Sequence, residues 1–209
     1  MKTGESLGSR LKRGVCCFGL SVVLPCPSVI EMAALAGYDF VRIDWEHALF
    51  GAIELRELLN TARLVGMPCQ VRVPELTMIT PLLGQEPAGI MVPHVESEKE
   101  ARAAVDACRF QPLGRRGMDG NTRRMRCEGM TRRTYMEYQQ ENLDIVVQIE
   151  SIPAMEKIDE ILSLDGITMA ATGRADLSQE LGFPGQKNHP AVLEAEEFII
   201  RKVLEHGKH

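Results

Sequence analysis

Short apolar runs rich in β-branched residues recur along this chain and alternate with segments of helical periodicity. The runs lie at 15–23, 39–43, 69–73, 88–92, 144–149 and 167–171. Helices are predicted over 28–36 and 53–65, each followed by a glycine, over 101–108 behind a capping box at Ser97 and Glu100, and from Pro190 to about His206. Because the strands are continuously apolar, both faces of their sheet must be covered. The pattern predicts parallel β-α-β units within one α/β domain spanning 1–209.

Composition narrows the class of protein. With 209 residues, 44% hydrophobic and 25% charged, the chain has the composition of a globular protein with one core. Its formal charge of -5 argues against nucleic acid as a partner. The polar, basic stretch at 1–13 is expected to be a flexible N-terminus, and no apolar run is long enough for a signal peptide or a membrane span. Six cysteines without a C-x-x-C pair are expected to be reduced thiols, so we expect a cytoplasmic protein.

Polar side chains gather where the predicted strands end. These residues are Asp44, Glu46 and His47 after the second strand, Arg72 in the third, Gln148 and Glu150 at the fifth, and Asp176 after the sixth. In a parallel α/β barrel or open sheet, the carboxyl ends of the strands share one face, and ligands bind there. The sequence therefore predicts that these residues converge.

Two of the carboxylates have the chemistry of a metal site. Glu150 and Asp176 follow adjacent predicted strands and offer hard oxygen ligands, which suit Mg²⁺ or Mn²⁺ that keeps part of its shell open for substrate. Either carboxylate alone is more typical of a helix cap. The occurrence of the pair at matching strand ends favours the metal.

The neighbouring basic residues suggest proton transfer beside that metal. His47 could act as a base, with Asp44 holding one ring nitrogen and raising the basicity of the other. Arg72 lies between two valines of a buried strand and needs an anion, structural or substrate. Together these groups fit stabilisation of an enolate on a metal-chelated 2-oxo acid.

Other candidates leave alternatives open. Eight arginines lie between Arg109 and Arg133 with few aromatic residues beside them, which disfavours nucleic-acid binding. The segment is expected to be a loop at the mouth of the site, a subunit interface or a solvated loop. His94 either borders the pocket or is structural.

Several segments of the sequence resemble those of a known family, the metal-dependent 2-oxo acid aldolases of the HpcH/HpaI kind. This family is typified by 4-hydroxy-2-oxoheptanedioate aldolase and 2-dehydro-3-deoxyglucarate aldolase. The matching pieces, in family order, are AGYDFVRIDWEHA, QVRVP, IMVPHVESEKEAR, RFQPLGRRG, VVQIES, GRADLSQELGFPGQKNHPAV and EHGK. The resemblance implies a TIM-type (β/α)₈ barrel that assembles into homo-oligomers. This chain holds only about six of the eight strands, which suggests a C-terminal truncation.

The resemblance also implies roles for individual residues. His47 would be the base supported by Asp44, and Arg72 would stabilise the enolate. The metal ligands would be Glu150 and Asp176. The carboxylate of the 2-oxo acid would be bound by Gln148 and by the backbone at Gly173, Ala175 and Asp176. The implied cofactor is Mg²⁺ or Mn²⁺, with Co²⁺ also suitable.

Two local departures from the family pattern bear on the tuning of His47 and on the preferred substrate. The chain reads Leu83-Gly84-Gln85-Glu86 where the family has an Asp that tunes the histidine, so Glu86 could substitute from two residues later. Gly173-Arg174 replaces the family's Gly-Pro and is expected to add a positive side chain beside the metal site.

The predicted function is a carbon–carbon lyase that forms or cleaves a 4-hydroxy-2-oxo acid from pyruvate and an aldehyde through an enolate held by the metal. One alternative is a condensing relative, such as a siderophore-type citrate synthase. Another is an inactive, truncated paralogue that serves as a binding or oligomer-forming module.

Overall fold

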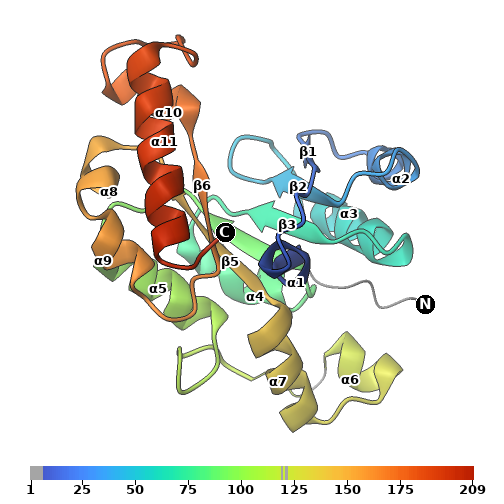
Figure 1. The fold of residues 1–209 in the computed structure, drawn as a ribbon. Helices are drawn as coiled ribbons and strands as arrows, with labels where there is room; N and C mark the ends of the chain where they lie inside the picture. The colour runs from blue at the N-terminus through green and yellow to red at the C-terminus, as the bar shows by residue number, and fades with distance from the viewer. Residues whose placement is uncertain (1–6, 119, 121) are drawn as a thin grey trace.

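The computed structural model describes residues 7–118, 120 and 122–209, and its centre is a curved parallel sheet (Figure 1). Six strands are hydrogen-bonded in sequence order, every neighbouring pair parallel. The strands are β1 Gly19–Val22, β2 Phe40–Asp44, β3 Cys69–Arg72, β4 Gly89–Val92, β5 Asp144–Ile149 and β6 Met169–Thr172. Each strand lies beside the next one in the sequence, as in a barrel wall, so the predicted α/β class and TIM-type architecture, with six strands in the described residues, are confirmed.

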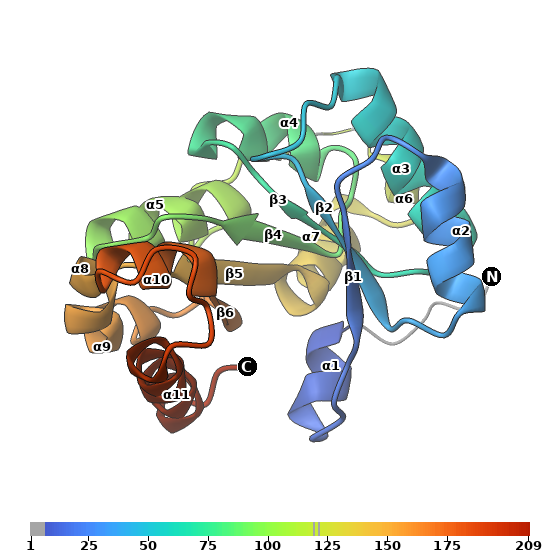
Figure 2. The ribbon, with the colours of Figure 1, turned by 90° about the horizontal axis from the view of Figure 1, so that it is seen from above.

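Helices surround the sheet: the first precedes β1 and packs against the concave side, and most of the others follow strands and cover the convex side (Figure 2). They are α1 Leu7–Lys12, α2 Pro27–Leu35, α3 Ala52–Leu64, the 3₁₀ turn η1 Leu76–Met78, α4 Ile79–Leu83, α5 Glu98–Cys108, α6 Arg123–Glu128, α7 Arg132–Asn142, α8 Ile152–Glu156, α9 Ile158–Leu162, α10 Arg174–Glu180 and α11 Pro190–Glu205. Half of the predicted capping box is present: the Ser97 side chain accepts a hydrogen bond from the Glu100 N–H, but the Glu100 carboxylate accepts from the Glu96 N–H at 2.8 Å. None of these helices is both long and apolar enough to cross a membrane.

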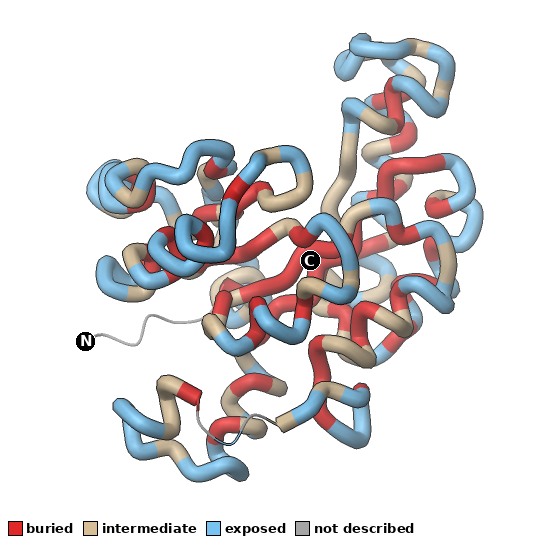
Figure 3. The backbone as a smooth tube through the Cα atoms, turned by 180° about the vertical axis from the view of Figure 1, so that it is seen from behind, coloured by how far each residue is buried: buried red, intermediate tan, exposed pale blue. Residues whose placement is uncertain are grey.

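Alternation along the strands divides the core into two layers. Val41 and Ile43 of β2 pack outward, in the large cluster between sheet and helices, whereas Arg42 and Asp44 take the other face. A small cluster on the concave side joins Met91, Val146 and Met169 to Leu7 of α1. The buried strands form the middle of the molecule in Figure 3. The concave face is therefore the one that carries polar side chains toward the carboxyl ends of the strands.

Both ends of the described chain contact the rest of the fold. Residues 7–12, which fell within the predicted flexible N-terminus, form α1 with Leu7 buried, while residues 1–6 lie outside the described part. The first strand begins at Gly19 rather than at Val15, because pairing with β2 begins at Gly19 and Phe40. At the other end, the N–H of His209 donates to Thr168 at 3.3 Å, and its carbonyl accepts from Ala170 at 2.8 Å.

Candidate active site

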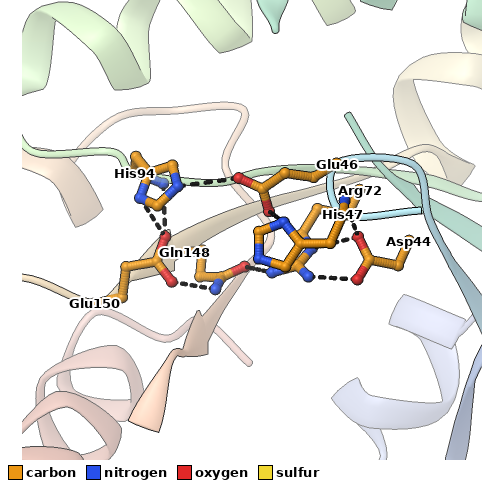
Figure 4. A network of polar contacts seen from close by, with 7 residues as sticks. All are labelled: Asp44, Glu46, His47, Arg72, His94, Gln148 and Glu150. Atoms are coloured by element: carbon orange, nitrogen blue, oxygen red, sulfur yellow. Dashed lines mark hydrogen bonds and ion pairs between the residues drawn. The ribbon is translucent and has the colours of Figure 1, made fainter. Parts of the chain in front are cut away.

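The candidate site lies at the carboxyl ends of β2, β3 and β5 (Figure 4). Register places Asp44, the last residue of β2, directly beside Arg72, the last residue of β3. Gln148 lies near the end of β5, and Glu150 follows the strand immediately. Residues more than a hundred positions apart thus meet on the concave side, as the strand-end pattern predicted.

The guanidinium of Arg72 is the centre of this site. Its Nε and Nη2 donate to the two carboxylate oxygens of Asp44 at 3.0 and 2.6 Å. Its Nη1 lies 3.4 Å from Oε1 of Gln148, and Nε lies 3.1 Å from Oε2 of Glu46. Burial is the largest single effect and acts to lower the pKa of Arg72, but the hydrogen bonds with Asp44 and the negative charges of Asp44, Glu46 and Glu150 together raise that pKa. Arg72 is therefore a fixed, permanently charged group with Nη1 turned toward Gln148.

Glu150 is held from two sides by neighbouring polar groups. It is 2% exposed; its Oε2 accepts from the Gln148 amide, and its Oε1 accepts from the main-chain N–H of His94 at 2.9 Å. Burial raises the pKa of Glu150, the His94 N–H partly offsets this, and the negative charge of Asp176 raises the pKa further. A buried carboxylate that senses a second carboxylate in this way would be stabilised by a bound cation.

His94 joins this network through its ring as well as its backbone. Nδ1 lies 3.0 Å from Oε1 of Glu150, and Nε2 lies 3.0 Å from Oε1 of Glu46. The residue has φ 52, in the left-handed region that non-glycine residues seldom adopt. This backbone turns both the N–H and the ring toward Glu150. Sequence reasoning left His94 between pocket and structural roles, and the strand-end position after Pro93 was its only signal.

Asp44 and His47 meet through the backbone rather than through the ring. Oδ1 of Asp44 accepts the main-chain N–H of His47 at 3.2 Å. Burial acts to raise the pKa of Asp44, but hydrogen bonds from Arg72 and from the His47 N–H lower it. The His47 ring is 62% exposed, and its Nδ1 lies 3.6 Å from Oε2 of Glu46.

The loop after β6 supplies the remaining predicted residues. A Cβ added at Gly173 would lie 2.7 Å from Cβ of Glu150 and 3.0 Å from Nε2 of Gln148, so only glycine leaves these two side chains in place. Asp176 is half-buried in the first turn of α10. Ala175 is exposed, and its carbonyl accepts from the Ser178 hydroxyl at 2.6 Å.

Two groups of side chains have the chemistry to hold a divalent cation. Donor atoms of Asp44, Glu46 and His47 lie within 4.8 Å of one another, but Arg72 already supplies positive charge to both carboxylates there. Glu150 and Asp176 are the other pair, with Gly173 keeping the space beside the Glu150 carboxylate open. This second pair provides hard oxygen donors, which suit Mg²⁺ or Mn²⁺.

The local departures from the family pattern point away from the site. Glu86 has φ 57, and its carboxylate accepts the N–H of Arg124 at 3.2 Å, at the start of α6. Arg174 faces α11, with Nε 3.4 Å from Oε1 of Glu196 and Nη1 3.4 Å from Asn188.

Much of the arginine-rich segment is structural. Buried Arg109 donates to the carbonyls of Gly166, Gln139 and Gln140. Arg116 lies over the Phe110 ring and donates to the Tyr135 hydroxyl at 3.2 Å. Helix α7 leads into the first residue of β5, at the opposite end of that strand from Glu150. The described part of the segment therefore lies away from the mouth of the site.

Comparison with known proteins identifies the class. Residues 18–209 match the family model described as HpcH/HpaI aldolase/citrate lyase, so the chain belongs to that family, and the resemblance seen in the sequence is confirmed. The lyase activity predicted from the sequence is that of this family.

Individual relatives narrow the comparison. The chain is 32% identical to 2-keto-3-deoxy-L-rhamnonate aldolase of Escherichia coli (strain K12) over 201 residues, which cover 95% of this chain and 75% of that protein. It superimposes on the HpcH/HpaI aldolase from Desulfitobacterium hafniense DCB-2 with a TM-score of 0.90 and 30% identity, covering 98% of this chain and 80% of that one. The citrate synthase SbnG gives a TM-score of 0.87 and 32% identity, with the same coverage of both chains.

Proposed function

We propose that this protein is a divalent-metal-dependent aldolase that forms or cleaves a 4-hydroxy-2-oxo acid from pyruvate and an aldehyde. The observation that carries the proposal is the linkage of Arg72, Gln148 and Glu150 at the carboxyl ends of β3 and β5, in a chain of the HpcH/HpaI family. Arg72 supplies a fixed positive charge, and Glu150 is a carboxylate that can hold a cation; a developing enolate is stabilised by positive charges placed in this way.

The metal would be held by Glu150 and Asp176, and Mg²⁺ or Mn²⁺ fits these oxygen donors, with Co²⁺ as a further candidate. When bound, it would supply Lewis-acid polarisation of the 2-oxo acid. The 2-oxo acid carboxylate would be bound by Gln148 and the backbone at Gly173, Ala175 and Asp176. Arg72 would donate to the oxygen that becomes negative, because its Nη1 is the corner of the guanidinium that Asp44 does not occupy.

His47 is the proposed base. Its ring is largely exposed on the same face as Arg72 and can reach a substrate hydroxyl from there. It would remove the proton of the 4-hydroxyl group during cleavage and return it during addition. Asp44 would support this step by holding both the His47 backbone and the Arg72 guanidinium.

Exchange of pyruvate methyl protons with solvent deuterium, followed by proton NMR, tests the proposal. We expect exchange with Mg²⁺ or Mn²⁺, loss of exchange with a chelator, and a decrease of about 100-fold or more in Arg72→Ala, because one preorganised charge is worth that much. Arg133→Ala, which removes an exposed arginine, is the matched control. Folded protein without exchange would refute the aldolase and favour a non-enzymatic binding module, and undiminished exchange in Arg72→Ala would refute the role of that residue.

A second candidate is a condensing enzyme that uses oxaloacetate and an acyl-CoA. This candidate is supported by the similarity to citrate synthase SbnG, because the sequence identity and TM-score are about the same as those for the HpcH/HpaI aldolase. Release of free CoA thiol from acetyl-CoA with oxaloacetate would identify this activity. Cleavage of 4-hydroxy-2-oxo acids without thiol release would identify the aldolase.

We also infer a cytoplasmic homo-oligomer. All six cysteines are free, in keeping with a reducing compartment. Exposed apolar side chains lie on α2, at Met32 and Leu35, and on α11, at Ile200 and Leu204, where they are available to a second copy. Light scattering after gel filtration would give the mass, and a monomer of 23.2 kDa would refute the assembly.

A further inference from the structure

The two carboxylates that flank Trp45 both lie beside Arg72, but only Asp44 accepts hydrogen bonds from it. Both oxygens of Asp44 are taken by Arg72, at 3.0 and 2.6 Å, and Oδ1 also accepts the His47 N–H. A carboxylate that grips a guanidinium with both oxygens has little freedom to follow a mobile imidazole. Asp44 is therefore committed to Arg72 and to the backbone.

One carboxylate oxygen of Glu46, Oε2, accepts no hydrogen bond from the described residues. Its Oε1 lies 3.0 Å from Nε2 of His94. Its Oε2 is buried and receives no directed hydrogen bond from any protein group of the described residues, although Nε of Arg72 lies 3.1 Å away. Leaving a buried acceptor without a hydrogen bond costs roughly 1 to 3 kcal/mol. A nearby donor that can turn toward Oε2 will therefore be drawn to it.

The nearest ring donor is the imidazole of His47. Nδ1 lies 3.6 Å from Oε2 of Glu46, an ion-pair contact just beyond hydrogen-bond length. Because the ring is largely exposed, a small side-chain rotation closes this gap without moving the core. Figure 4 shows the His47 ring beside Glu46 and Arg72, with Asp44 on the far side of the guanidinium.

We propose that Glu46, rather than Asp44, is the residue that positions the His47 imidazole. Glu46 accepts the Nδ1–H of His47, which fixes the Nδ1–H tautomer and leaves Nε2 as the free base that faces substrate. Asp44 orients Arg72 instead. The catalytic meaning of this arrangement rests on the proposed function, whereas the placement of the ring does not.

The tautomer of His47 tests the placement directly. Long-range ¹H–¹⁵N NMR at a pH where the imidazole is neutral separates the Nδ1–H and Nε2–H forms, and a His47→Gln variant identifies the signal among the five histidines. We expect mainly Nδ1–H in the native protein and in Asp44→Asn, and a change to mainly Nε2–H in Glu46→Ala. Glu46→Gln keeps an acceptor oxygen and should retain the native tautomer, so it covers a failure of the alanine variant to fold. A native tautomer in Glu46→Ala, or its loss in Asp44→Asn but not in Glu46→Ala, would overturn the proposal.

Kinetics supply the second readout. Glu46→Ala should lower kcat/KM for aldol cleavage by about 10- to 100-fold, typical for a residue that orients a catalytic histidine from behind. In a His47→Ala background the same change should have little further effect, whereas Asp44→Asn should still show its full loss through Arg72. Glu137→Ala, an exposed glutamate, is the control. A native protein that shows the expected tautomers but does not catalyse aldol cleavage would refute the proposed function and leave this inference standing. Fully additive losses of kcat/KM from Glu46→Ala and His47→Ala would refute this inference and leave the proposed function standing.

Discussion

We expect the free energy of unfolding of Asp144→Asn, relative to that of the native chain, to be higher at alkaline pH than at acidic pH. Asp144 opens β5 on the concave side and is only 4% exposed. Its Oδ2 has no hydrogen-bond partner among the described residues. Burial raises the pKa of Asp144 from 3.8 to about 7, although the charge of Arg109 and a hydrogen bond with Gln70 act against the shift.

The sign and size of the effect follow from proton linkage. Below pH 3.8 the carboxyl is protonated in both folded and unfolded chains, and its contribution to stability is fully present. As the pH rises toward 7, the unfolded chain ionises first while the folded chain keeps its proton, so stability is lost. A displacement of about three pH units corresponds to an upper limit of about 4 kcal/mol, reached above pH 7.

Urea unfolding of both proteins between pH 4 and pH 8.5 measures this difference. Asparagine imitates the protonated carboxyl and cannot ionise, so other titrating groups cancel in the comparison. The free energy of unfolding of Asp144→Asn minus that of the native protein should increase from pH 4 to pH 7 and then level off. A difference that stays constant with pH would show that Asp144 does not titrate in this range, and the reasoning from burial would be refuted.

Further predictions concern the arginine-rich segment and the glycine beside Glu150. Arg109→Ala leaves buried carbonyls without donors and should lower the free energy of unfolding, measured in urea, by about 3 to 5 kcal/mol. The control, Arg133→Ala, removes an exposed arginine and should change that free energy by less than about 0.5 kcal/mol. Equal effects would contradict the structural role. Gly173→Ala should displace the Glu150 carboxylate and weaken Mn²⁺ binding, measured by calorimetry, by about tenfold or more. Unchanged affinity would place the metal elsewhere.

The sheet could be predicted from the sequence because its strands are continuously apolar and bounded by good helix signals. Residues that follow strands in such a fold share one edge whatever the details, so the convergence of Arg72, Gln148 and Glu150 was also predictable. The first strand was predicted too long because apolar letters at 15–18 continue the run. Pairing decides where a strand begins, and it begins only at Gly19.

Contacts between side chains were harder to predict. The three-residue spacing of Asp44 and His47 suggested a carboxylate on the ring, but the main-chain N–H lies closer and Arg72 occupies both oxygens. The hydrogen-bond partners of Arg109 could not be predicted from the sequence either, because Gly166, whose carbonyl it contacts, lies 57 positions further along the chain. Local spacing does not carry this information, since the tertiary fold decides which carbonyls need a donor.

The left-handed backbone of His94 has a consequence for how this position can vary. A β-carbon in that conformation carries strain of roughly 1 to 3 kcal/mol, which glycine would relieve. Glycine would keep the main-chain bond to Glu150 but would forfeit the ring that spans two acidic groups. Glycine at this position would therefore raise stability and remove the ring contacts to Glu46 and Glu150. A screen that selected for heat resistance alone would favour glycine here and lose the imidazole.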